Sequence, residues 1–358
     1  MKFKLNHPYK TILTSIAKRI KEQGYELYLV GGTIRDALMG RISTDIDLAT
    51  NATPNSIESL FKETVATGKK YGTITIKKTY QSIKIPIQIT TFRSDGDYSD
   101  SRHPDSVTFE TSLKEDVKRR DFTINALAYD LLTEEIVDYV EGKNDLKNKI
   151  LRVIGNPQAR FQEDSLRLVR CCRFMAQFEF SCEIKTWETV CMLGKTITLP
   201  SKERITQELL KLLASKKPSI GINALIESGL GERLFPGISN SHKTVINDLD
   251  KLERNIRLAY LLKDLEIDRC FRQLRLSKKQ EKWIKSMIQH NFDHKKVVFT
   301  KKDLALSGAD IKSMGFQDKQ IGIIQQHCLD YVMQDFSHNT KVKLKHYIQT
   351  ISNEGNIH

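Results

Sequence analysis

The sequence predicts an α+β fold at the N-terminal end and an all-α remainder, from the spacing of apolar residues and the turns that separate them. Residues 9–23 have the period of an amphipathic helix, and Thr33–Met39 are predicted to form a short one. Runs rich in β-branched and aromatic residues predict strands. These runs are YELYLV (25–30), DIDLAT (45–50), YGTITIKK (71–78), IKIPIQITTF (83–92) and SVTFE (106–110). Helices and strands therefore mix in the first part of the chain.

The pattern becomes helical throughout after residue 156. Asn156 is a good helix N-cap and Pro157 suits the first helical position. Turns are predicted at SGLGERLFPG (228–237) and SGAD (307–310), where glycines interrupt the helical period. The segment DGDYSDSRHPDS (95–106) is rich in Gly, Asp and Ser, which is typical of a surface loop.

A chain of 358 residues is long enough for two or three domains. Neither a signal peptide nor an apolar run that could cross a bilayer is found, so we expect a cytoplasmic protein that does not contact a membrane. The six cysteines have no CxxC spacing, which favours reduced thiols and argues against a zinc site. They are Cys171, Cys172, Cys182, Cys191, Cys270 and Cys328.

The formal net charge is +13, and most of this excess lies after Ser215. A basic surface predicts a polyanionic partner, and nucleic acid is the commonest one. The sequence indicates no obligate protein partner.

The segment LVGGTIRDALMGRISTDIDLAT (29–50) carries the clearest site. Asp45 and Asp47 are two residues apart in a predicted strand, so both carboxylates should project from one face. Such a pair suits Mg²⁺ shared with substrate phosphates. Gly31 and Gly32 end the preceding strand and would let the backbone approach a triphosphate, while Arg35 could bind its charge.

A second candidate is KRRDFTINALAYD (118–130). Asp121 resembles a helix N-cap, with Arg119 and Arg120 before it at the predicted helix start. These arginines could contact phosphate or ribose. A capped helix with solvated arginines is an equally good interpretation of this segment alone.

The third candidate is RFQEDSLRLVRCCRF (160–174). On one helix, Asp164 and Arg167 would face the same way, with Arg170 and Arg173 continuing the row. A fixed Asp accepts from an exocyclic amine, and a fixed Arg donates to a ring acceptor. Such a pair would admit CTP and ATP and exclude UTP and GTP. Alone, the segment fits better an ion pair between Glu163 and Arg167 beside a solvated basic stripe.

Taken together, these segments and SKERITQEL (201–209) resemble the ordered motifs of class II tRNA nucleotidyltransferases, the CCA-adding enzymes. The resemblance extends over roughly residues 25–210 and is only general beyond 215. It implies a polymerase-β-like head with a mixed sheet, followed by an elongated helical neck, body and tail. We expect the head at 1–140, the base-recognising neck at 141–215 and the tRNA-binding body and tail at 216–358.

The resemblance also implies an activity and its parts. The activity is Mg²⁺-dependent, two-metal addition of CMP and AMP to the 3′ end of tRNA, with CTP and ATP as substrates. Asp45 and Asp47 would hold the metals. The body and tail would grip the acceptor and T arms of tRNA through phosphates. The nucleotide would be contacted by Gly31, Gly32, Arg35, Arg120, Asp164, Arg167, Arg170 and Arg173.

Further roles and one departure follow from the same resemblance. Glu203 and Arg204 would brace the base-reading helix, and 95–106 would be the loop used in switching from C to A addition. Many members carry a third acidic residue before the TFR segment, where this chain has Gln88.

Three alternatives stay open at this point. A bacterial poly(A) polymerase shares the head motifs, although TGKKYGTITI (67–76) resembles the CCA-adding pattern. An enzyme that adds only CC or only A is the second alternative, and the apparently intact loop argues against it. The third is a non-catalytic RNA-binding protein, which would have little need for both Asp45 and Asp47.

Overall fold

The computed structural model describes residues 2–43, 45–80, 83–96, 106–293, 296–297 and 299–353. The chain divides into two compact units, Met1–Pro200 and Ser201–His358. This division falls inside the predicted neck, and the boundaries at 140 and 215 stay a prediction. Within the described ranges, no helix is both long enough and apolar enough to cross a bilayer.

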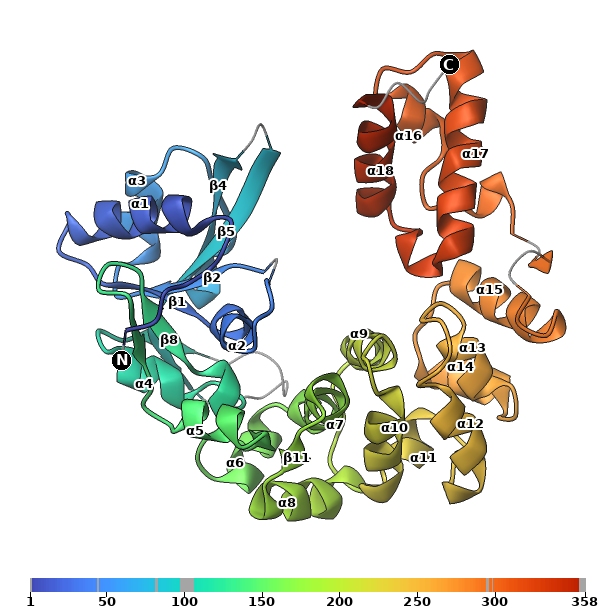
Figure 1. Ribbon diagram of the computed structural model, residues 1–358, viewed down its shortest axis with the longest axis horizontal. Coiled ribbons are helices and arrows are strands. Elements are labelled where there is room, and N and C mark those ends of the chain that lie inside the picture. The colour runs from blue at the N-terminus through green and yellow to red at the C-terminus, as the bar shows by residue number, and fades with distance from the viewer. Residues whose placement is uncertain are drawn as a thin grey trace. The chain divides into compact units, whose positions relative to one another are not determined.

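A seven-stranded mixed sheet forms the centre of the first unit (Figure 1). Its strand order is β3-β4-β5-β2-β1-β8-β9, in which β2 and β5 run parallel and the other neighbouring pairs run antiparallel. The α+β prediction is thereby confirmed. The strands are β1 (Leu27–Val30), β2 (Asp47–Thr50), β3 (Thr64–Gly68), β4 (Thr73–Tyr80), β5 (Ile83–Thr91), β8 (Ala128–Asp130) and β9 (Glu135–Val137).

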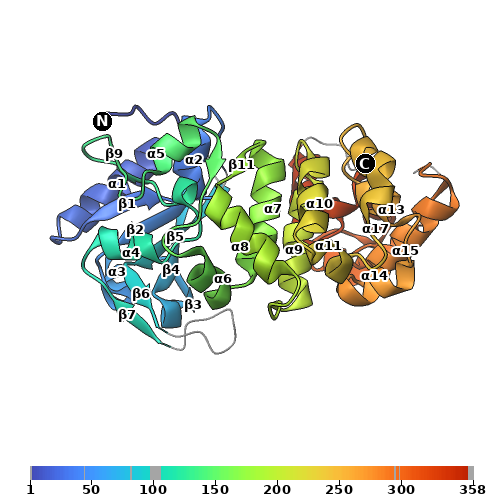
Figure 2. The same cartoon turned by 90° about the horizontal axis from the view of Figure 1, so that it is seen from below.

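Helices pack on both faces of this sheet. On one face, α1 (Lys10–Lys21) and α3 (Pro54–Leu60) bury apolar residues against the strands, forming the larger core (Figure 1). On the other face, α4 (Leu113–Lys118) packs on a smaller core that contains Val30 and Ala49. The short hairpin of β6 (Arg93–Asp95) and β7 (Val107–Phe109) lies beside α4 (Figure 2). Both faces of the sheet are therefore partly covered.

The remaining helices of the first unit lie partly between the strands along the chain and partly after them. The predicted N-cap is confirmed, because the Asn156 side chain accepts from the Ala159 amide at 3.0 Å. Among the described residues after 156, the predicted helical pattern is interrupted by the short strand β11 (Ser181–Cys182), which pairs in parallel with β10 (Ile150–Leu151). The helices are α2 (Gly32–Leu38), α5 (Gly142–Lys147), α6 (Pro157–Glu163), α7 (Leu166–Phe178) and α8 (Ile184–Gly194), with one-turn 3₁₀ helices η1 (Lys69–Tyr71) and η2 (Thr123–Asn125).

The described part of the second unit is helical. An aromatic cluster of Trp283, Phe299 and Phe336, with ring centroids 5.2–5.5 Å apart, contributes to its interior. The α-helices are α9 (Lys202–Leu213), α10 (Pro218–Glu227), α11 (Leu230–Leu234), α12 (Lys243–Asp248), α13 (Arg257–Leu262), α14 (Ile267–Gln273), α15 (Lys278–Gln289), α16 (Gly308–Lys312), α17 (Asp318–Gln334) and α18 (Lys341–Asn353). Shorter 3₁₀ helices are η3 (Asn240–His242), η5 (Lys301–Asp303) and η6 (Phe336–His338).

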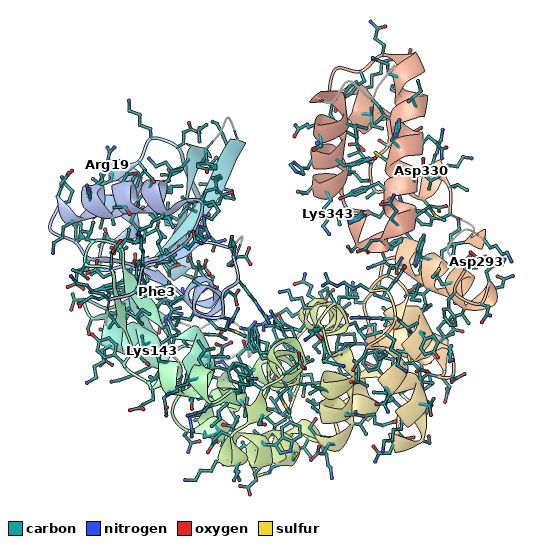
Figure 3. All side chains as sticks on the ribbon, in the orientation of Figure 1. Phe3, Arg19, Lys143, Asp293, Asp330 and Lys343 are labelled. Atoms are coloured by element: carbon teal, nitrogen blue, oxygen red, sulfur yellow. The ribbon has the colours of Figure 1, made fainter. Side chains whose placement is uncertain are left out.

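Two predicted turns of this unit contain helical residues. The segment 228–237 includes α11, which begins after the left-handed Gly229. The segment 307–310 begins α16, because the Ser307 hydroxyl accepts from the Asp310 amide at 3.1 Å. A serine that caps a helix and a serine in a turn have similar sequence neighbours. The last two helices carry exposed charges such as Asp330 on α17 and Lys343 on α18 (Figure 3).

Candidate functional site

Asp45 and Asp47 lie at the start of the central strand β2. The strand is shorter than the predicted 45–50, since it begins at Asp47. The predicted alternation nevertheless extends to Asp45: Ile46 and Leu48 are buried, whereas Asp45 and Asp47 are exposed. The Thr33 hydroxyl donates to the Asp45 carbonyl oxygen at 2.6 Å and so links this segment to α2.

Gly31 provides space directly beside Asp47. It follows β1 and has a φ of 75°, a conformation that strongly favours glycine. A Cβ atom added at Gly31 would lie 3.8 Å from Asp47 Oδ2 and 3.9 Å from Arg120 Nη1. The glycine thus leaves a space bordered by a carboxylate and a guanidinium. Gly32 begins α2, and a Cβ there would lie 3.1 Å from Arg35 Nη2.

The charge of Asp45 contributes to a perturbed ionisation of Asp47. The pKa of Asp47 is raised, first by desolvation and then by the charge of Asp45, while Arg120 opposes the shift. Side chains that crowd around Asp47 thus desolvate it although part of it remains accessible. A carboxylate whose pKa is raised beside a second carboxylate is a fitting site for a divalent cation, which favours the ionised form.

Arg120 is held near this site by a buried carboxylate that was not among the predicted site residues. Asp116 on α4 is fully buried and accepts from Arg120 Nη2 at 2.9 Å and from Arg119 Nη2 at 2.7 Å. Burial alone would raise the pKa of Asp116, but Arg120 and Arg119 lower it below its ordinary value. The i,i+3 and i,i+4 spacing of Asp116 to these arginines was the sequence pattern that could have identified it.

The predicted helix after Asp121 is wrong. Arg119 and Arg120 follow the end of α4, and the residues beyond Asp121 form only the 3₁₀ turn η2. Asp121 Oδ1 accepts from the Phe122 amide at 2.7 Å and from Asn125 Nδ2 at 3.1 Å. Its Oδ2 accepts from Arg170 Nε at 3.0 Å. Asp121 is therefore the partner of an arginine on α7, which no local pattern could reveal.

Arg35 on α2 is buried and bound by other protein groups. Its guanidinium donates to Asp36 Oδ1 at 2.8 and 2.9 Å and to the Asn125 side chain, and it lies 4.4 Å from the ring centroid of Phe178. Burial lowers the pKa of Arg35, with Asp36 opposing that shift. In this geometry Arg35 connects α2 to α7, and its predicted phosphate contact stays a prediction.

The predicted single helix over 160–174 is broken at Asp164. Helix α6 ends at Glu163 and α7 begins at Leu166, with Asp164 extended between them at φ −141° and ψ 97°. The Asp164 side chain accepts from the Leu166 amide at 3.2 Å, a local bond that competes with helix continuation. Asp164 and Arg167 are thus on either side of a helix start.

Arg167 is buried and held by three hydrogen bonds. Its Nη1 donates to the Arg160 carbonyl at 2.7 Å and to Glu163 at 2.9 Å, and its Nη2 donates to the Arg119 carbonyl at 3.2 Å. The Glu163–Arg167 ion pair considered above is therefore present. These bonds use three of the five N–H groups of a guanidinium. Among the described residues, the Nε edge is left for another acceptor.

Arg170 and Arg173 do not form a solvated stripe. Both guanidinium groups contact the ring of Phe174, at 5.1 Å and 3.8 Å from its centroid, and Arg173 is buried. Arg170 also pairs with Asp121, whose pKa burial would raise but Arg170 lowers. The row of arginines predicted on one helix face is thus largely packed against protein.

Two other sequence predictions, the loop at 95–106 and the bracing role of Glu203 and Arg204, are not tested by the site described above. Residues 97–105 of the predicted loop are outside the described residues, and only the paired strands β6 and β7 at its base are seen. Glu203 and Arg204 lie on α9 in the second unit, where Glu203 pairs with Arg275 at 3.1 Å. Their predicted bracing of α7 stays a prediction.

The sequence matches known families in two segments. The model described as the poly A polymerase head domain matches residues 27–152. The model described as a probable RNA and SrmB-binding site of polymerase A matches residues 179–241. The CCA-adding enzyme of Staphylococcus aureus (strain Newman) is 37% identical over 274 residues, which cover 76% of this chain and 67% of that protein.

The fold is similar to those of solved CCA-adding enzymes. The Bacillus stearothermophilus enzyme in complex with CTP superposes with a TM-score of 0.69 at 25% identity, covering 97% of this chain and 99% of that one. The Thermotoga maritima enzyme complexed with tRNA gives a TM-score of 0.58 at 22% identity, covering 78% and 69%. The second likeness establishes similarity of fold alone.

The Asp116 network yields a stability prediction. Asp116→Asn leaves two guanidinium groups without their buried anion, and we expect it to lower the free energy of unfolding by about 3 kcal/mol at neutral pH. Because the folded-state pKa of Asp116 is lowered, its stabilisation is complete above the ordinary carboxyl pKa near ~4. It is lost as the pH falls through the lowered value. The difference between wild type and variant should therefore shrink in acid.

Urea unfolding at several pH values, followed by circular dichroism, measures this difference. Glu115→Gln is the matched control, since Glu115 is on the same helix but forms an exposed pair with Lys118. Its loss should cost less than about 1 kcal/mol. Equal effects of the two variants, or a difference that persists unchanged in acid, would contradict the assigned role of Asp116.

Proposed function

This chain belongs to the family of CCA-adding enzymes, and from that premise we propose that it adds CMP and AMP, taken from CTP and ATP, to the 3′ end of tRNA without a nucleic-acid template. The observation that carries the proposal is the pair of exposed carboxylates Asp45 and Asp47, of which Asp47 borders the space at Gly31. Enzymes of this family generally use a divalent metal ion. We further propose that the metal is Mg²⁺ and that the protein acts in the cytoplasm.

Asp45 and Asp47 are the residues proposed to hold the metal. Carboxylate oxygens are the ligands Mg²⁺ prefers, and one or two of them together with substrate phosphates commonly suffice. When bound, Mg²⁺ would lower the pKa of the attacking 3′-hydroxyl and neutralise negative charge on the phosphates. The reaction joins the 3′ oxygen of the RNA to the α-phosphorus and breaks its bond to pyrophosphate. The chain's task is to align these atoms.

The triphosphate is proposed to lie in the space at Gly31, near Arg120. A side chain at Gly31 would obstruct the approach, and Gly32 likewise exposes backbone at the start of α2. Arg120 supplies positive charge there while Asp116 fixes its guanidinium. Arg35 acts indirectly by positioning α2 against α7 through its contact with Phe178, while Asp36 on the same helix holds its guanidinium.

The base is proposed to be read by Asp164 and Arg167. Fixed geometry is a requirement for discrimination, and the three bonds to Arg167 supply it. Its Nε edge can donate to the ring acceptor that cytosine and adenine share, while Asp164 accepts from their exocyclic amines. Arg170 and Arg173 support this helix from the side of Phe174.

The tRNA is proposed to bind the second unit by its acceptor and T arms. Lysines there are well exposed, among them Lys251 at 83% and Lys278 at 93% of the side chain. Lysine contacts with phosphates give affinity that depends on RNA shape and salt rather than on base sequence.

A tRNA lacking its terminal CCA tests the function directly. Purified protein is given CTP, ATP, or both, and the products are sequenced. We expect CC with CTP alone and CCA with both nucleotides. A run of A residues would indicate a poly(A) polymerase. Products that stop at CC with both nucleotides, or single A additions to tRNA ending in CC only, would indicate a partial activity and contradict the proposal.

Asp45→Asn and Asp47→Asn are each expected to abolish nucleotide incorporation, with a loss of about a thousandfold or more. Loss of one carboxylate weakens the hold on the cation while leaving the second unit intact, so tRNA binding in a gel-shift assay should be unchanged. Glu63→Gln, an exposed carboxylate on the first unit paired with Lys84, is the control and should retain activity. Full activity in either aspartate variant refutes the metal assignment.

Asp164→Asn and Arg167→Gln are each expected to relax nucleotide choice. Removing a fixed partner of the base edge should lower the preference for CTP over UTP by about tenfold or more. Competition between labelled nucleotides measures this ratio. Arg152→Gln removes an arginine that pairs with Asp145 and should leave the ratio as it is. Unaltered discrimination against UTP and GTP in folded Asp164 and Arg167 variants would defeat the base-reading role.

A further inference from the structure

Gln88 on β5 lies beside the proposed metal-binding carboxylate Asp47. The parallel register of β2 and β5 makes Gln88 the direct Cα partner of Asp47. The backbone N–H of Gln88 donates to the carbonyl oxygen of Ile46 at 3.2 Å, which fixes this register next to Asp47. Neighbouring strands are about 4.8 Å apart. The two side chains therefore start from adjacent points on the sheet.

Both side chains project from the same face. Ile87 and Ile89 on either side of Gln88 are fully buried, and Gln88 itself is exposed. The same alternation makes Asp47 exposed between two buried residues. Because partners opposite one another in a sheet share a face, the side-chain amide of Gln88 is directed to the side of the sheet on which Asp47 and Asp45 lie.

The residues that flank Gln88 and Asp47 on the neighbouring strands carry no charge. The next residue in this row is the neutral Thr75 of β4, the direct partner of Gln88. On the opposite side the row continues with the apolar Val30. Among the described residues, no group of three or more Asp, Glu, His or Cys could hold a metal ion. Arg120 adds a positive charge close to Asp47.

We propose that Gln88 is the neutral third member of the cation site, and that the nucleotide-free protein consequently binds a divalent cation weakly. The inference rests on the proposed function, since it takes Asp45 and Asp47 as the cation ligands. An amide oxygen is an acceptable ligand for a hard cation, but it adds no charge to the site. Two carboxylates opposed by one guanidinium leave the cation dependent on oxygens from the triphosphate. The cation and the nucleotide therefore bind together.

Titration of the nucleotide-free, full-length protein with Mn²⁺, with free Mn²⁺ read by electron paramagnetic resonance, tests this inference without measuring catalysis. Gln88→Glu replaces the amide by a carboxylate of nearly the same shape. We expect it to raise the affinity for Mn²⁺ at least about tenfold, because a full charge interacts strongly with a cation a few ångströms away.

Thr79→Glu is the matched control for added charge. Thr79 is exposed on β4 and lies on the same face as Thr75, four residues further along the strand. This places Thr79 about 13 Å from Thr75 along the strand, and so well away from Gln88. At that distance solvent and salt screen the new carboxylate, so the affinity for Mn²⁺ should change less than about twofold. Circular dichroism verifies that each variant is folded.

The outcomes separate this inference from the proposed function. If Asp47→Asn is inactive but Gln88→Glu binds Mn²⁺ no better than Thr79→Glu, the metal site stands and the role of Gln88 is overturned. The role of Gln88 is likewise overturned if the wild type already binds Mn²⁺ as tightly as Gln88→Glu. The metal assignment itself fails if two results occur together. These are that Asp47→Asn keeps its activity, and that the double variant Asp47→Asn, Gln88→Glu binds Mn²⁺ as tightly as Gln88→Glu alone.

Discussion

The alternation of buried and exposed residues at the start of β2 is the constraint on which the site depends. Ile46 and Leu48 are buried in the larger core, so Asp45 and Asp47 are directed to the opposite side of the sheet. Placing either carboxylate in that core would strongly disfavour its ionised form, the form that binds a cation. The position of the two charges is thus set by packing on the other face of the strand, and Gly31 keeps the adjacent space open.

A network of buried and partly buried carboxylates and arginines links Arg120, beside this site, to α7. Asp116 holds Arg119 and Arg120, Asp121 holds Arg170, and Glu163 holds Arg160 and Arg167. The Arg119 carbonyl accepts in turn from Arg167. Buried charges are tolerated only when they are paired in this way, and such pairing fixes each group in place. The same residues that resist desolvation therefore orient the groups proposed to meet phosphate and base.

Local sequence patterns predicted much of this molecule because local physics determines it. The amphipathic period of α1, the four strands β1, β2, β4 and β5 and the Asn156 cap depend on neighbours within a few residues, and all are confirmed. The other strands of the central sheet, β3, β8 and β9, were not predicted. The resemblance to CCA-adding enzymes was confirmed by the matching relatives. From the sequence, Gln88 could be recognised only as a departure from the family pattern. The register that sets it beside Asp47 could not be predicted, because the pairing of β2 with β5 is non-local.

What the sequence could not predict depends on contacts between distant segments. The helix expected after Asp121 does not form, since that carboxylate binds Arg170, 49 residues further along. The break at Asp164 was missed because the helical period continues across it, while the side chain bonds to the Leu166 amide. The contact of buried Arg35 with Phe178 on α7 was also missed, because spacing within 29–50 cannot reveal a partner so far along the chain.

The central claim is that Asp45 and Asp47 together hold a divalent cation in the space beside Gly31. Anomalous X-ray scattering from crystals grown with Mn²⁺ and CTP tests it most directly. We predict a manganese peak within coordination distance of both carboxylates and of the nucleotide phosphates. A peak bound elsewhere on the protein, or a bound nucleotide with the two aspartate side chains turned away from it, would contradict this claim.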